Sequence, residues 1–134
     1  MFLFLTVLPN MAIAEDDETL LVASPMQHEV LTQKELRQYL SGQKPSWPDG
    51  TAVTIILFPK SSKELSWLCK NIIKLPVTTY RRFLMQKAFR SGIKIIEVQT
   101  TKEAKELLLN TPGAIAPLHQ SQIEKNIHPL TISE

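Results

Sequence analysis

The sequence contains little of what several classes of protein depend on. Its single cysteine, Cys69, excludes an internal disulfide bond, and its four glycines argue against the glycine-rich loops that bind nucleotides. No segment has the run of about 20 apolar residues that is needed to cross a bilayer. The net charge of +2 is too small to indicate a polyanion partner. We therefore expect neither nucleic-acid binding nor stable membrane insertion.

Signs of catalysis and of metal binding are also missing. The three histidines, His28, His119 and His128, have no metal-ligand spacing and no nearby cysteine, which favours loop or surface positions. The chain has no nucleophile motif of the Gly-x-Ser-x-Gly kind. It also has no pair of carboxylates in an apolar setting that would act as an acid and a base. We predict a protein that is not an enzyme and that carries no metal and no cofactor.

What is present indicates one soluble globular domain. The 134 residues are 43% hydrophobic and 21% charged, a composition that can bury a core of useful size. Strands that alternate with helices predict an α/β domain with a largely parallel or mixed sheet. We place this domain at residues 18–118 and expect an irregular tail, with at most a short edge strand, at residues 119–134.

The first 14 residues have the character of a secretory signal peptide. They contain no charged residue, and they end in Ala12-Ile13-Ala14, a small-x-small cleavage pattern that is followed by acids. A basic residue near the start, usual in such peptides, is missing. The alternative is a first strand or helix of the domain. Cleavage after Ala14 would make the mature protein periplasmic or secreted.

Apolar periodicity and turn signals predict the elements of the domain. Thr32 and Glu35 have the spacing of a capping box, as do Thr100 and Glu103, and each pair predicts the start of a helix. In the helix at residues 77–90 we expect the buried side to consist of Tyr80, Phe83, Leu84 and Ala88. The elements expected are strands at residues 19–24, 52–57, 93–98 and 114–116, the last ended by Pro117, and helices at residues 32–42, 62–74, 77–90 and 100–109.

The positions of two further side chains, Trp47 and Cys69, can also be interpreted from the sequence. Trp47 lies in a loop rich in turn residues, where an aromatic ring usually packs over the core; contact with a ligand is the alternative. Cys69 lies beside the apolar stripe of its helix, and this position favours burial over pairing with another molecule.

The turn formed by Lys60, Ser61, Ser62 and Lys63 is the candidate site. It follows the apolar strand at residues 52–57 and leads into a helix, whose first N–H groups and dipole both favour an anion. The alternative is an ordinary helix start, in which Ser61 and Glu64 form a third capping box. In that case the charge of Glu64 would oppose an anion.

The charges of the middle of the chain favour the same kind of ligand. Between Lys60 and Lys94 there are nine basic residues and one acid, Glu64. Such a distribution raises the local concentration of a small anion. The same residues are equally typical of the solvated faces of two helices.

Several motifs resemble the periplasmic phosphate-binding proteins of ABC transporters. That family has a helix that ends in a phenylalanine or similar residue, one further residue and a glycine, followed by a Trp-Pro-Asp-Gly turn. It also has an aromatic helix that ends in Phe-x-x-Gly and a strand that begins Pro-Gly-Ala-Ile. The matching segments here are Leu31–Gly42, Trp47–Gly50, Tyr80–Phe83, Phe89–Gly92 and Thr111–Ala116.

The resemblance implies a single lobe like one domain of a type II periplasmic binding protein, with a mixed sheet flanked by helices. In the family a turn with hydroxyls and an arginine contacts phosphate. Here Ser61 and Ser62 match the hydroxyls, and Lys60 or Lys63 stands in for the arginine. The glycine of the family's Ser-Gly-Thr-like turn is missing. The resemblance therefore implies a domain that binds phosphate or a similar small oxyanion. The alternative is an accessory domain that keeps the fold and contacts a protein partner or a second copy of itself.

Overall fold

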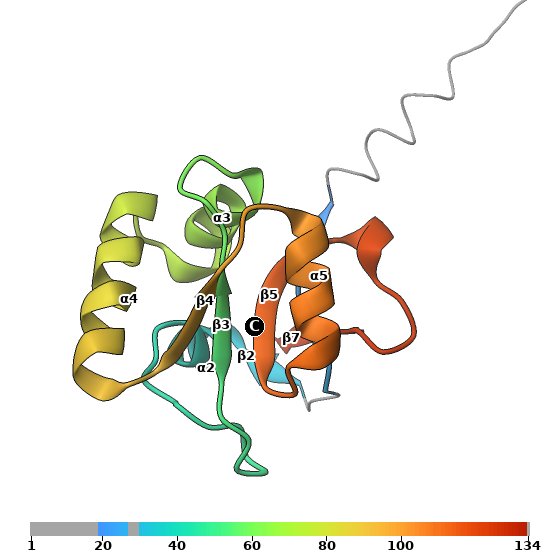
Figure 1. Ribbon diagram of the computed structural model, residues 1–134, viewed down its shortest axis with the longest axis horizontal. Coiled ribbons are helices and arrows are strands. Elements are labelled where there is room, and N and C mark those ends of the chain that lie inside the picture. The colour runs from blue at the N-terminus through green and yellow to red at the C-terminus, as the bar shows by residue number, and fades with distance from the viewer. Residues whose placement is uncertain (1–18, 27–29, 134) are drawn as a thin grey trace, which may run out of the picture.

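A mixed five-stranded sheet forms the centre of the protein (Figure 1). The computed structural model describes residues 19–26 and 30–133; the expected signal peptide and His28 lie outside these residues. The strand order is β4-β3-β5-β1-β6. The strands are β1 (Leu20–Ser24), β3 (Thr54–Leu57), β4 (Lys94–Glu97), β5 (Ala114–His119) and β6 (His128–Pro129), and a separate parallel pair is formed by β2 (Leu31–Thr32) and β7 (Ile132–Ser133).

The directions of the strands confirm the expected mixed α/β sheet. Strand β3 is parallel to both of its neighbours, β4 and β5, whereas β1 is antiparallel to β5 and to β6. Parallel neighbours need long crossover connections, and here helices provide them. Consequently β3, β4 and β5 all end at the same edge of the sheet, which we call the carboxyl edge.

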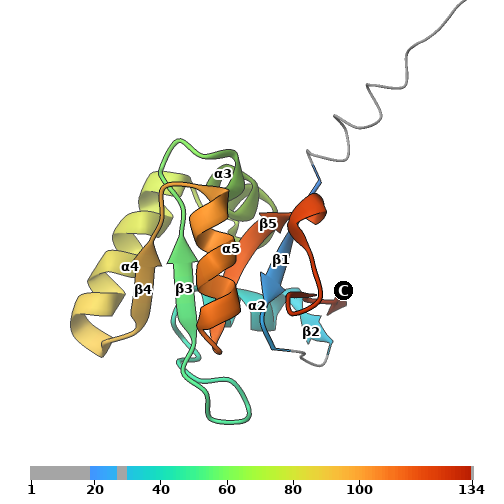
Figure 2. The ribbon, with the colours of Figure 1, turned by 45° about the vertical axis from the view of Figure 1, so that its right-hand side comes forward.

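Helices cover both faces of the sheet (Figure 2). Helix α5 lies on one face, and helices α2 and α3 lie on the other, while α4 lies beside the outer strand β4. The helical segments are α2 (Gln33–Leu40), α3 (Lys63–Leu68), the π-helix η2 (Cys69–Ile73), α4 (Val77–Ser91), α5 (Thr101–Asn110) and the short 3-10 helix η3 (Gln120–Gln122).

The first predicted capping box is confirmed. At the start of α2, Glu35 N donates to Thr32 Oγ1 at 3.0 Å, and Thr32 N donates to Glu35 Oε1 at 2.9 Å. This backbone donor lowers the pKa of the Glu35 carboxyl group, so the side chain stays ionised and fixed to the helix start.

The helix after Phe58 is divided into two kinds of turn. It begins as α3 and continues as the π-helix η2, which ends at Lys74 in the left-handed conformation (φ 65°). The predicted apolar stripe is buried along both parts, at Leu65, Leu68, Ile72 and Ile73.

The buried side of α4 is narrower than the sequence predicts. Tyr80 and Leu84 are buried, but Phe83 remains 38% exposed and Ala88 is half-buried. The reason is the position of the helix, which lies beside the last strand of the sheet and has little to pack against on its outer sides (Figure 1).

The prediction that Pro117 ends the last strand is wrong. Strand β5 pairs with β3 at Ala114 and Ile115 and then with β1 from Ala116 to His119. Pro117 lies opposite Val22, whose carbonyl accepts from Leu130 N at 2.8 Å on its other side. The proline therefore occupies a position where β5 needs no N–H donor.

The segment after β5 packs on the same core as the rest of the domain. It includes the short strands β6 and β7, and its side chains Ile127 and Leu130 are buried. The sequence predicts at most one short edge strand here.

Trp47 covers the core, as predicted. It is 2% exposed, its ring stacks on Tyr39 with centroids 4.2 Å apart, and its Nε1 donates to Gly113 O at 3.0 Å. A Cβ atom on Gly113 would lie 1.8 Å from Ala52 O, so only glycine allows this close approach. The tryptophan and the glycine thus join the loop before β3 to the turn before β5.

Cys69 is buried, and we expect its thiol to be unreactive in the folded protein. Burial raises the pKa of the thiol from 9.0 to about 11. At pH 8 the thiolate fraction is therefore roughly 100-fold lower than in the unfolded chain. We expect a thiol reagent to modify the native protein at least 100-fold more slowly than the urea-unfolded protein, and equal rates would contradict this account.

The same raised pKa fixes the sign of the pH dependence. Below pH 9 the thiol is protonated in both states, and its contribution to stability is constant. Between pH 9 and about 11 the unfolded thiol ionises first, so the free energy of unfolding falls as the pH rises.

In the described ranges, none of the helices combines the length and the apolar character that crossing a bilayer requires.

Candidate functional site

The carboxyl edge of the sheet brings together segments that are far apart in the sequence. The turn after β3, the connection from β4 to α5, and His119 at the end of β5 all lie there (Figures 1 and 2). In open α/β sheets ligands bind outside the carboxyl ends of the strands. This edge is therefore the place to examine the predicted turn.

The structure places the four predicted site residues in one turn at this edge. Lys60, Ser61 and Lys63 are exposed, and Ser62 is the half-buried N-cap of α3. The Ser62 hydroxyl donates to Pro59 O at 2.7 Å and accepts from Leu65 N at 3.1 Å. The proton of the Ser62 hydroxyl thus makes a hydrogen bond within the protein, whereas Lys60, Ser61 and Lys63 are exposed.

The capping box of Ser61 and Glu64, the alternative that the sequence leaves open, is not formed. The N-cap is Ser62, one residue later, and Glu64 is buried with 8% exposure. Its Oε2 lies 2.7 Å from His119 Nε2, in a hydrogen bond that the ring N–H donates to the carboxylate. The one acid of the candidate turn is thus directed toward β5 and has a donor there.

Sequence reasoning missed His119, which was expected at a surface or in a loop. It ends strand β5, but the sequence predicts that this strand stops before Pro117, which placed His119 in the expected irregular tail. Thr101, Ser121 and Gln122 surround it and form a shallow depression of about 260 Å³. Polar groups from the end of β5, from η3 and from the start of α5 are therefore gathered there.

Arg81 is the second residue that the sequence did not mark. Its NH1 donates to Phe58 O at 3.0 Å, and its NH2 donates to Glu97 Oε1 at 3.0 Å. These bonds join α4 to the ends of β3 and β4. Arg81 therefore uses guanidinium donors to hold the end of β3 in position, and these donors do not point to solvent.

Three acids at the carboxyl edge, within the part of the chain that the structure describes, accept hydrogen bonds from groups of the protein. Glu97 accepts from Arg81, Glu64 from His119, and Glu103 Oε1 from Gln99 N at 2.7 Å. The last bond accompanies the cap of α5, where Glu103 N donates to Thr100 Oγ1 at 3.1 Å. Lys60 and Lys63 are the exposed charged residues of the predicted turn.

The described residues also contain no metal-binding cluster. Among residues 19–26 and 30–133, no cluster of three or more His, Cys, Asp or Glu side chains is placed to hold a metal ion.

Two solved structures each contain a part with a similar fold. The match to an ABC-type phosphate transport receptor from Vibrio cholerae covers 84% of this chain and 45% of the receptor chain, with 14% identity and a TM-score of 0.55. PstS from Borrelia burgdorferi matches 86% and 47%, with 18% identity and a TM-score of 0.60. No family model and no curated protein matches the chain.

These likenesses define the fold of the protein. It is a small α/β domain with the fold of a part of phosphate ABC transporter receptors, as the sequence motifs predict. The chain spans less than half the length of either receptor.

Proposed function

We propose that the protein is an exported, non-catalytic domain that binds phosphate or a similar small oxyanion at the carboxyl edge. The observation that most supports this is the turn at Lys60–Lys63, where two exposed lysines stand at the end of a parallel strand. A solved structure that shares this fold over part of its length is an ABC-type phosphate transport receptor, which agrees with the proposal.

The proposed site relies on charge more than on shape. Lys60 and Lys63 supply positive charge, Ser61 supplies a hydroxyl, and the N-terminal ends of α3 and α5 add their dipoles. Because Glu64 is hydrogen-bonded to His119, its repulsion of an anion is reduced. A lysine offers a point charge without the planar fork of arginine, so we expect weak binding, with a Kd of about 1 mM.

Export and partners complete the proposal. The leader at residues 1–14 would direct the domain to the periplasm or out of the cell, where it would take part in oxyanion uptake. A protein partner or a second copy of the chain would shield a bound anion from water.

A second function is an accessory domain that has kept the fold without ligand binding. The internal use of Ser62 and Arg81 favours it, because both side chains give their donors to backbone or carboxylate oxygens of the protein. Fold alone does not decide between the two functions.

Calorimetric titration with phosphate and sulfate separates these functions. We expect saturable heat with the unaltered protein and at least about tenfold weaker binding in the variant Lys60→Ala/Lys63→Ala. A matched control, Lys70→Ala/Lys94→Ala, removes the same charge at exposed positions outside the turn and should bind as the unaltered protein does.

Two results would count against the proposal. No heat at millimolar anion, with the protein folded by circular dichroism, would favour the accessory domain. Equal weakening in both double variants would assign binding to the overall charge and not to the turn.

A further inference from the structure

A second hollow lies away from the carboxyl-edge turn, between helix α2 and the segment that joins η2 to α4. Its volume is about 340 Å³, within the range of small-molecule sites. It shares no residue with the turn at Lys60–Lys63. The residues that line it are Lys34, Arg37, Gln38, Ser41, Gln43, Ile73, Leu75, Tyr80 and Phe83.

One wall of this pocket consists of hydrogen-bonding side chains from α2 and its C-terminal end. Lys34, Arg37, Gln38 and Ser41 follow each other at helical spacing and so share one side of the helix. Arg37 NH1 makes a long hydrogen bond of 3.4 Å to Ile72 O, which orients the guanidinium toward η2. The remaining N–H groups of its planar fork are available to a ligand in the pocket.

The opposite wall is apolar. Leu75 and Phe83 keep 41% and 38% of their surface exposed and so offer apolar area to a ligand. Ile73 and Tyr80 lie beneath them, and the Tyr80 hydroxyl already donates to Leu40 O at 2.6 Å. Tyr80 therefore contributes mainly ring surface to this wall.

The charge of the pocket has one sign. Lys34 and Arg37 are its ionised residues, and the lining includes no aspartate or glutamate. The neighbouring acid on α2, Glu35, is bound to the backbone at the helix start. A ligand that matches both walls must carry a negative group and an apolar group.

We propose that this pocket binds a small organic anion with an apolar tail, of the class of medium-chain carboxylates. The carboxylate pairs with the guanidinium of Arg37, with Lys34 adding charge, and the tail packs on Leu75 and Phe83. This site differs in place and in ligand from the proposed oxyanion site, so neither proposal depends on the other.

Titration with octanoate, followed by calorimetry and by amide chemical shifts, tests the pocket. We expect saturable binding, with shifts at residues 34–43 and 73–83. Octanol, which lacks the charge, and inorganic phosphate, which lacks the tail, should each bind there at least about tenfold more weakly.

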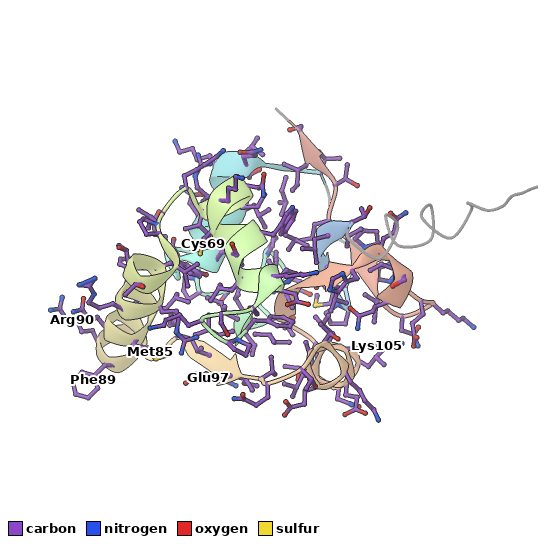
Figure 3. All side chains as sticks on the ribbon, turned by 90° about the horizontal axis from the view of Figure 1, so that it is seen from above. Cys69, Met85, Phe89, Arg90, Glu97 and Lys105 are labelled. Carbon is purple, nitrogen blue, oxygen red and sulfur yellow. The ribbon has the colours of Figure 1, made fainter. Side chains whose placement is uncertain are left out.

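Matched variants assign the binding to the two walls. Arg37→Gln and Phe83→Ala should each weaken octanoate binding at least about tenfold. The controls are Arg90→Gln and Met85→Ala, because Met85 is 38% exposed, as Phe83 is, yet does not line the pocket. Figure 3 shows Phe89 and Arg90 on the outer side of α4, away from the body of the domain. The controls and Lys60→Ala/Lys63→Ala should leave octanoate binding within about twofold.

Three outcomes would overturn the proposal. They are no saturable shift below about 10 mM octanoate, equal binding of octanol, and equal weakening by the controls. If Phe83→Ala does not fold, the shifts of the unaltered protein and Arg37→Gln still decide the question.

Discussion

Replacing Trp47 with alanine is expected to lower the free energy of unfolding by about 3–5 kcal/mol. The side chain is 2% exposed and stacks on Tyr39, so its removal leaves a large cavity over the core. It also removes the Trp47 Nε1 donor from Gly113 O, which then keeps the hydrogen bond from Thr54 N at 3.0 Å. Urea unfolding followed by circular dichroism measures the loss.

Two further variants separate packing from hydrogen bonding at this position. Trp47→Phe keeps an aromatic ring but loses the Nε1 donor to Gly113 O, and we expect a loss of about 1 kcal/mol beyond the smaller ring's lost packing. Trp67→Ala removes the other tryptophan, which is partly buried, and should cost clearly less than Trp47→Ala. If Trp67→Ala lowers the free energy of unfolding as much as Trp47→Ala does, this account of Trp47 is wrong.

Replacing His119 with leucine is expected to lower the free energy of unfolding by about 3 kcal/mol. The side chains of Glu64 and His119 are 11% and 20% exposed, so the carboxylate would remain largely buried without its 2.7 Å partner. The bond also joins the start of α3 to the end of β5. We expect the candidate turn to become less ordered in this variant, which amide hydrogen exchange at residues 60–64 measures.

The double variant Glu64→Leu/His119→Leu should recover most of that loss. It removes the buried charge together with its partner, and apolar replacements of such pairs are often neutral. As a control, Lys105→Ala breaks the 2.6 Å pair with Glu124, whose side chains are 31% and 48% exposed, and should cost less than about 1 kcal/mol (Figure 3 labels Lys105). A double variant less stable than His119→Leu would contradict this account of the pair.

Local signals in the sequence predicted much of the fold. The box of Thr32 and Glu35 depends on residues three apart, and it forms as expected. The second box forms in part, since Thr100 caps Glu103 N while Glu103 reaches Gln99 N, one residue before the N-cap. In such cases the interacting groups are neighbours in the chain, and their spacing is visible in the sequence.

The errors arise where distant contacts override local ones. Ser61 and Glu64 have the same spacing, but Glu64 bonds to His119, 55 residues away, and Ser62 becomes the cap. Pro117 stays within β5 because β3 has already stopped pairing there. Phe83 is exposed because α4 lies at the edge of the sheet. None of these conditions is visible in a short window of sequence.

The candidate site was predictable in position but not in detail. Turn residues after an apolar strand placed Lys60–Lys63 at the carboxyl edge, where the parallel strands end. The sequence did not predict that Ser62 gives its proton to Pro59 O, or that Arg81 binds Phe58 O. The Ser62 bond lies within the turn, between residues three apart, whereas the Arg81 bond depends on how α4 packs against the ends of β3 and β4.

An amide chemical-shift titration with inorganic phosphate tests the proposed oxyanion site most directly. We predict saturable shifts at residues 60–64 and 99–101, at the turn and at the start of α5, with smaller changes elsewhere. No saturable shift up to about 10 mM phosphate, or shifts confined to other parts of the folded domain, would contradict the proposed site.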